Sequence, residues 1–106
     1  MIVVTTNNIE GKEILEYKGL VRGIVVRTPT VWQVIARGFK GLLSGNNIRY
    51  MRMCEQARQE AYTMMIQHAV ELGANAVVGV RYDTGDLGGY HGSSEVFCYG
   101  TAVILR

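Results

Sequence analysis

The sequence predicts an α+β domain of two layers, in which an antiparallel β-sheet packs on one long helix and a second, short helix lies beside them. Three observations predict this class. Runs of β-branched and aromatic residues occupy both ends of the chain, a long helical pattern fills the middle, and turn signals separate the segments. A chain of 106 residues forms one domain, which we place at residues 1–106.

The composition excludes several classes of protein. The apolar fraction is 48% and the charged fraction 19%, which argues against disorder. The net charge is +2 and the arginines are scattered, whereas an electrostatic nucleic-acid binder carries a basic stripe. We expect no nucleic-acid or membrane partner, because no charged leader, amphipathic basic run or membrane-length apolar run occurs. We therefore expect a cytoplasmic protein with two free thiols, Cys54 and Cys98.

Strand-forming residues dominate the first part of the chain. Residues 2–5 form a short run of this kind, and a turn signal follows at Asn7-Asn8. Residues 13–27 form a longer run rich in Val, Ile, Leu and Tyr. It contains Gly19 and Gly23, and glycine inside a strand pattern indicates a bulge or bend. We predict one long, kinked strand or two abutting strands here.

A short helix is predicted at residues 30–43. Thr30 and Gln33 have capping-box spacing after Pro29 ends the strand. Gly38 and Gly41 weaken this helix, each by up to about 1 kcal/mol relative to alanine. Apolar residues recur at helical spacing at Val31, Val34, Ile35, Phe39, Leu42 and Leu43.

Residues 49–72 carry the strongest helical pattern. Gly73, directly after them, suits the left-handed conformation that ends many helices. The apolar stripe of this helix is formed at three- and four-residue steps by Cys54, Ala57, Ala61, Met64, Met65, His68 and Leu72.

Two more strands complete the predicted sheet. Residues 76–82 form an apolar strand, residues 83–92 a flexible glycine-rich loop, and residues 94–105 a long last strand. Alternation puts Val78, Val80 and Tyr82 on one side of the first of these strands. The opposite side takes Val77, Gly79 and Arg81.

Both faces of the last strand are mostly apolar. One face carries Val96, Cys98, Gly100, Ala102 and Ile104, which suit close contact with the small residues of the long helix. The other face carries Phe97, Tyr99, Thr101, Val103 and Leu105. A face open to water normally reads polar, and the short helix is too small to cover a sheet of such long strands. We therefore predict that a second copy of the chain covers this face.

The segment Glu-Leu-Gly-Ala-Asn-Ala-Val-Val-Gly-Val-Arg-Tyr-Asp-Thr at 71–84 closely resembles the signature of the YbjQ-like family. Further matches are Ile-Val-Val-Thr-Thr at 2–6, Leu-Val-Arg-Gly at 20–23 and Tyr-Gly-Thr-Ala-Val at 99–103. Members are small bacterial proteins, sometimes labelled heavy-metal-binding. The resemblance implies a two-layer fold with an antiparallel sheet. It also implies a ring-forming subunit, a pentamer whose neighbours are joined by short extra strands.

Metal ligands are sparse in this sequence. Paired cysteines, as in C-x-x-C, are absent. Met51 and Met53 could offer soft sulfur near Cys54, but on a helix they diverge by about 200°. Cys54 and His68 lie about 21 Å apart along the same helix. A soft transition-metal ion would therefore need Cys54, His68 or Cys98 from several copies around an axis, and the alternative is that all three are core residues.

Three functions remain open from the sequence. The leading hypothesis is a homo-oligomeric binding or scaffold protein of unknown ligand. One alternative is a heavy-metal-binding protein with ions held at subunit interfaces. Another is an enzyme with a pocket between subunits, lined by Arg81, Asp83, His91 and Tyr99. We expect no enzyme, because no nucleophile elbow or other catalytic motif occurs.

His68 sits in the middle of the predicted apolar stripe. A histidine there is more often a core or interface residue with one hydrogen bond than a metal ligand. A buried neutral imidazole becomes charged in acid, so we predict that assembly weakens between pH 8 and pH 5.

Overall fold

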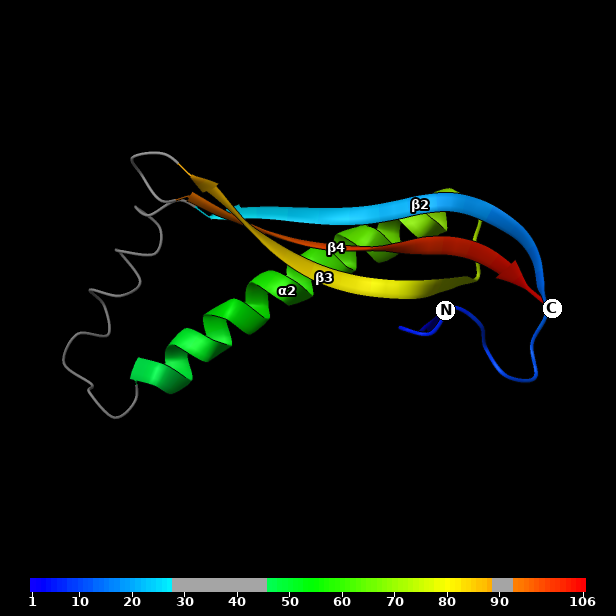
Figure 1. Ribbon diagram of the computed structural model, residues 1–106, viewed down its shortest axis with the longest axis horizontal. Coiled ribbons are helices and arrows are strands. Elements are labelled where there is room, and N and C mark those ends of the chain that lie inside the picture. The colour runs from blue at the N-terminus through cyan, green and yellow to red at the C-terminus, as the bar shows by residue number, and fades with distance from the viewer. Residues whose placement is uncertain (28–45, 89–92) are drawn as a thin grey trace.

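The computed structural model describes residues 1–27, 46–88 and 93–106, which form two layers. The strands are β1 (Ile2–Val3), β2 (Ile14–Arg27), β3 (Ala76–Gly88) and β4 (Ser93–Leu105), and helix α2 spans Asn46–Glu71. They form one sheet in the order β1-β3-β4-β2, and α2 crosses one side of it (Figure 1). The predicted α+β class is confirmed. The short helix predicted at 30–43 lies outside the described residues.

The sheet is mixed rather than purely antiparallel. β4 pairs antiparallel with both β2 and β3, as predicted. β1 runs parallel to β3, with Ile2 opposite Ala76, so the prediction of an antiparallel sheet is wrong at this edge. The reason is the path of the chain. After β1 it does not turn back beside β1 but continues to β2, which lies at the far edge of the sheet.

Two glycines interrupt the regular pairing of the strands. Gly19 has φ +118° at a register shift in β2, which confirms the bulge predicted there. Gly79 has φ +64° at a second shift, in β3. This second bulge reverses the alternation, so Val77 and Val80 both belong to the core beneath α2. The sequence prediction, which put these two valines on opposite sides, is therefore wrong.

β3 is longer than predicted. Residues 83–88, which we expected to form a loop, continue the strand and pair with the start of β4. The pairs include Asp83 with Phe97 and Gly85 with Glu95. This extension carries the sheet well past the apolar run from which β3 was predicted.

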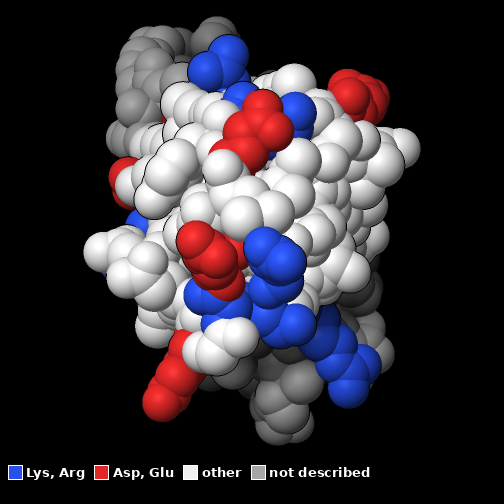
Figure 2. Space-filling model, turned by 90° about the vertical axis from the view of Figure 1, so that its right-hand side faces the viewer, with Lys and Arg blue, Asp and Glu red and all other residues white. Residues whose placement is uncertain are grey.

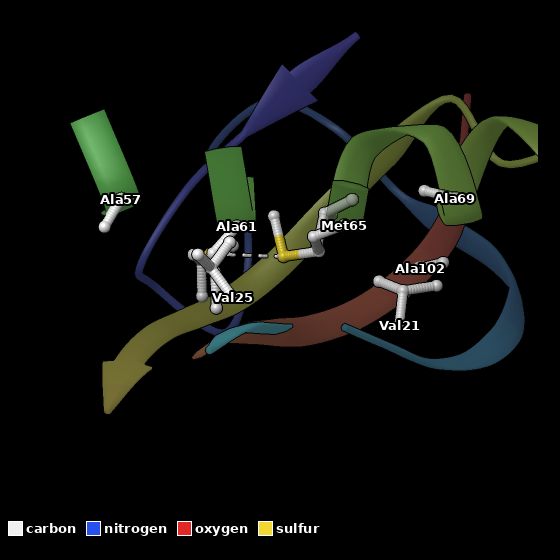
Figure 3. Close-up of a cluster of buried hydrophobic side chains, with 10 residues drawn as sticks. Val21, Val25, Ala57, Ala61, Met65, Ala69 and Ala102 are labelled. Atoms are coloured by element: carbon white, nitrogen blue, oxygen red, sulfur yellow. Dashed lines mark hydrogen bonds between the residues drawn. The ribbon is translucent and has the colours of Figure 1, made fainter. Parts of the chain in front are cut away.

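The core between helix and sheet is built from small side chains. Ala57, Ala61, Met65 and Ala69 of α2 are fully buried. This confirms three residues of the predicted stripe, whereas Met64 and Leu72, also predicted to belong to it, are exposed. Figure 3 shows the four buried residues facing Val21, Val25 and Ala102 of the sheet. β4 contributes Cys98 to the same cluster, on the face predicted for it. Small residues let the helix lie close to the strands.

Candidate functional site

The side of the sheet away from α2 is the main uncovered surface of the described residues. We call it the open face. Three exposed apolar side chains of β2 lie on it: Leu20 is 60% exposed, Ile24 41% and Val26 48%. The cross-strand pairs place further residues beside them, namely Arg22, Arg81, Asp83, Glu95, Phe97, Tyr99 and Thr101. A solvated sheet face is normally polar, whereas this one carries several exposed apolar side chains.

The chain itself covers the other end of this side of the sheet. Ala76, Val78, Val103 and Leu105 form a second buried cluster there. Val4, Ile9 and Ile14 of the N-terminal segment pack against this cluster. The backbone of the segment follows β3 beyond β1, since the Gly79 amide donates to the Thr6 carbonyl at 2.8 Å. The second face of the sheet is therefore partly covered by the chain's own N-terminal segment, a coverage that the sequence did not predict.

Two aromatic side chains form the centre of the open face. Phe97 and Tyr99 of β4 stack with their ring centroids 5.4 Å apart. Tyr99 is paired with Arg22 on one side and Arg81 on the other, while Phe97 is paired with Ile24 and Asp83. Residues directly opposite each other on neighbouring strands share one face of a sheet. The open face is thus an aromatic strip with charged and apolar side chains along both sides.

Three of the four residues predicted to line a pocket come together on this face. Arg81, Asp83 and Tyr99 are neighbours there, whereas His91 lies outside the described residues. Arg81 has a structural contact, because its Nη1 donates to the carbonyl oxygens of Thr5 at 2.7 Å and Val80 at 2.9 Å. Asp83 accepts the backbone N–H of Thr84 at 3.0 Å. Arg81 therefore ties the N-terminal segment of its own chain to the sheet.

A sulfur contact lies on the opposite side of β4. The Cys98 thiol donates to the Met65 thioether at 3.5 Å, as the dashed line in Figure 3 marks. The Tyr82 hydroxyl is hydrogen-bonded to the Cys98 thiol. Burial raises the pKa of Cys98, and the hydrogen bond from Tyr82 opposes this only in part. The thiol therefore stays protonated, which disfavours the thiolate that a metal ion requires.

Burial also raises the pKa of Tyr82 to about 12, with Cys98 as the next cause. The residue as a whole is 47% exposed, so this burial is partial. The interaction with Cys98 adds to the effect of burial.

The three candidate metal ligands do not converge. Cys98 is buried under the middle of α2, and Cys54 is half-buried nearer the start of the helix. His68 lies in the last turn of α2, where its Nδ1 accepts the Arg22 backbone N–H at 3.4 Å. Across the described part of the chain, no group of three or more His, Cys, Asp or Glu side chains could hold an ion. The described residues of a single chain therefore offer no complete ligand set for a metal ion.

An open hollow of about 420 Å³ lies along the exposed flank of α2. Its described lining consists of Gln56, Gln59, Glu60, Thr63 and Met64. The Gln59 amide donates to the Thr63 hydroxyl at 3.5 Å.

The surface charges are mixed in sign. Figure 2 views the end of the molecule where both termini lie and shows basic and acidic side chains interspersed among uncharged ones. Several basic side chains adjoin one another in the lower half of this view, with acidic side chains beside them. Of the described helical residues, none forms a span long and apolar enough to cross a membrane.

Comparison with known proteins places the whole chain in one group. Residues 1–106 match the YbjQ family, described as "Putative heavy-metal-binding". The chain is 52% identical over 106 residues to a UPF0145 protein of Francisella philomiragia, with full coverage of both chains. It is 50% identical over 105 residues to a UPF0145 protein of Legionella pneumophila, covering 99% of this chain and 98% of the relative.

A solved structure matches the fold. It is a protein of unknown function from Pediococcus pentosaceus, assigned to the DUF74 family, with a TM-score of 0.64. The match covers 100% of this chain and 98% of that one at 20% sequence identity. At this level of identity the match supports the fold alone.

Proposed function

This chain belongs to the YbjQ-like family, and from that premise we propose that it is a cytoplasmic, homo-oligomeric binding or scaffold protein. In this proposal, copies of the chain cover one another's open faces. The role is non-catalytic, and the ligand that the assembly would carry is not identified by its residues.

The exposure of the open face carries this proposal. Leu20, Ile24 and Val26 are each at least 41% exposed, and they lie together along β2. Burying one such side chain completely stabilises an assembly by about 1.5–3 kcal/mol. Most soluble homo-oligomers close with cyclic or dihedral symmetry. For the number of copies, we keep the ring of five that the family resemblance implies.

A pair of charged substitutions tests the proposal. Leu20→Lys with Ile24→Lys would place two ammonium groups in the interface, so we expect the assembly to dissociate at micromolar concentration. Val70→Lys is the matched control, because Val70 is 59% exposed on α2 and lies away from the open face. Sedimentation velocity measures both masses. The proposal fails if the double variant keeps the mass of the unmodified protein.

Metal binding is a second candidate, favoured by the family description. Since one chain offers no complete ligand set among its described residues, an ion would need ligands from more than one copy. Elemental analysis of the purified assembly is the test. Metal that is retained after Cys54→Ala and Cys98→Ala would exclude thiolate ligation, and an assembly without metal would remove this candidate.

A further inference from the structure

The two margins of the open face carry opposite charges. Arg22 lies on β2, at one edge of the sheet, and Asp83 lies on β3, at the other side of β4. Both project from the open face, because they pair with Tyr99 and Phe97 of β4 respectively. Both residues are exposed. The open face thus carries the cation Arg22 on its β2 margin, and the anion Asp83 beside Arg81 on its β3 margin.

Neither charge is neutralised within the described chain. The ion pair found there joins Lys18 Nζ to Glu16 Oε1 at 3.2 Å. Asp83 uses Oδ1 to cap the Thr84 amide and leaves its second oxygen available. The Arg22 guanidinium has no partner among the described residues, and its backbone amide is already bonded to His68. A group from another molecule that approached Arg22 would therefore contact its guanidinium rather than its backbone amide.

Arg22 and Asp83 of one chain are too far apart to form an ion pair with each other. They lie two strand spacings apart, about 10 Å, with β4 and its aromatic side chains between them. The other cation on this margin, Arg81, is directed to the carbonyl groups of Thr5 and Val80. Asp83 is therefore available to a group from outside the chain.

We infer that Arg22 of one copy forms an ion pair with Asp83 of the next copy. This inference rests on the proposed homo-oligomer and identifies its contact. Joining two β2 margins would oppose Arg22 to Arg22, and joining two β3 margins would oppose Asp83 to Asp83, both of which are unfavourable. An arrangement that joins unlike margins opposes Arg22 to Asp83. Repeated from copy to copy, such a head-to-tail contact closes into a ring when the rotation between copies divides a full turn.

The surroundings strengthen this ion pair. Leu20 and Ile24 flank Arg22 along β2, and Phe97 stands beside Asp83. Apolar contact around a charge pair excludes water and salt, so the pair contributes more than an ion pair on an open surface does. Its loss should therefore be visible in the association constant.

Cysteine crosslinking tests the direction of the contact. In a Cys54→Ser background, Arg22→Cys with Asp83→Cys should oxidise into a ladder of multiples of 11.8 kDa on non-reducing gels. The two positions cannot bridge within one chain, because disulfides require Cα atoms within about 7 Å. Each single cysteine variant is a control and should give no ladder. A ladder that stops at the dimer overturns the inference.

A charge exchange provides a second, independent test. Arg22→Glu alone and Asp83→Arg alone should each weaken association by at least about thirtyfold. The two substitutions together restore an opposite-charge pair and should recover most of the affinity. Equal weakening in the combined variant contradicts the inference. If the unmodified chain is a monomer, the proposed function fails as well, whereas an unmodified oligomer that ignores both charges sinks the ion pair alone.

Discussion

At the scale of single residues, several members of the segment 71–84, which carries the family resemblance, stabilise the fold. Gly73 ends α2 with φ +81°, and Gly79 makes the bulge of β3 with φ +64°. Asn75 joins the start of β3 to the end of β4, since its Nδ2 donates to the Leu105 carbonyl at 3.0 Å and its Oδ1 accepts the Leu105 amide at 2.7 Å. Arg81 holds the N-terminal segment. The backbone conformations of the two glycines and the hydrogen bonds of Asn75 and Arg81 explain why these residue types occur here, without a ligand.

Replacing Asn75 by alanine should destabilise the fold. The substitution removes both hydrogen bonds to Leu105 and leaves two backbone groups without partners, which costs about 1–3 kcal/mol. Urea denaturation measures the change in the free energy of unfolding. Asn8→Ala, at an exposed position in the N-terminal segment, is the control and should change it little. An unchanged unfolding midpoint for Asn75→Ala would contradict this role.

The buried Cys98 thiol should make the protein less stable in alkali. Burial raises the pKa of Cys98 above its ordinary value of 9.0, and the pKa of Tyr82 is raised to about 12. Above pH 9 the unfolded chain loses protons that the folded chain retains. The free energy of unfolding is therefore unaffected by these two groups below that pH and falls as the pH rises from 9 towards 12.

Variants isolate this contribution from that of the lysines. Tyr82→Phe and Cys98→Ala should each flatten the fall in the free energy of unfolding between pH 8 and pH 11, as measured by urea denaturation. Tyr17→Phe is the control, because Tyr17 is 68% exposed. If the free energy of unfolding falls equally steeply with pH in the unmodified protein and in all three variants, Cys98 and Tyr82 do not control the loss of stability in alkali.

At the scale of elements, the close approach of α2 to β2 depends on Gly23. A Cβ atom at this position would collide with the Ala61 carbonyl oxygen, and the Met64 Cβ would lie only 2.7 Å away. Helix backbone cannot move aside as a flexible side chain can. The glycine that the sequence indicated as a bend is instead the point where helix and strand touch.

Gly23→Ala should therefore shift or loosen the helix, at a cost of about 1–3 kcal/mol. Gly85→Ala is the matched control, because a Cβ there meets the nearest atom, Glu95 Cγ, at 3.4 Å and the backbone has no positive φ. Thermal unfolding compares the two variants. If both glycines tolerate alanine equally well, the packing described for α2 is incorrect.

His68 links the end of α2 to the edge of β2. Its Nδ1 accepts the Arg22 amide. We therefore predict that His68→Ala, which leaves this amide without its partner, lowers the free energy of unfolding by about 1 kcal/mol. Urea denaturation measures the change, and an unchanged unfolding midpoint would contradict the prediction.

The sequence was a sufficient guide to most of these elements but not to their irregularities. The spacing of apolar residues and the positions of glycines predicted α2, β2 and the helix-facing residues of β4. The bulge at Gly79 was missed, because the run Ala-Val-Val-Gly-Val looks regular and only the backbone shows that two valines share a face. The parallel β1 was missed because two residues carry no information on strand direction.

At the scale of the whole molecule, the described chain leaves part of its sheet exposed to solvent. α2 covers one face and residues 4–14 cover one end of the other, which leaves the exposed strip along β2 and the aromatic side chains of β4. The sequence predicted the two-faced sheet and brought Arg81, Asp83 and Tyr99 into one group. It could not reveal the pairing of Arg81 with Thr5, because that contact joins segments 76 residues apart.

The mass of the unmodified protein in solution tests the central claim most directly. Sedimentation velocity at micromolar concentration and pH 8 should give a single species at a multiple of 11.8 kDa, five times that mass for the ring we propose. A stable particle of 11.8 kDa under these conditions would contradict the claim that a second copy covers the open face.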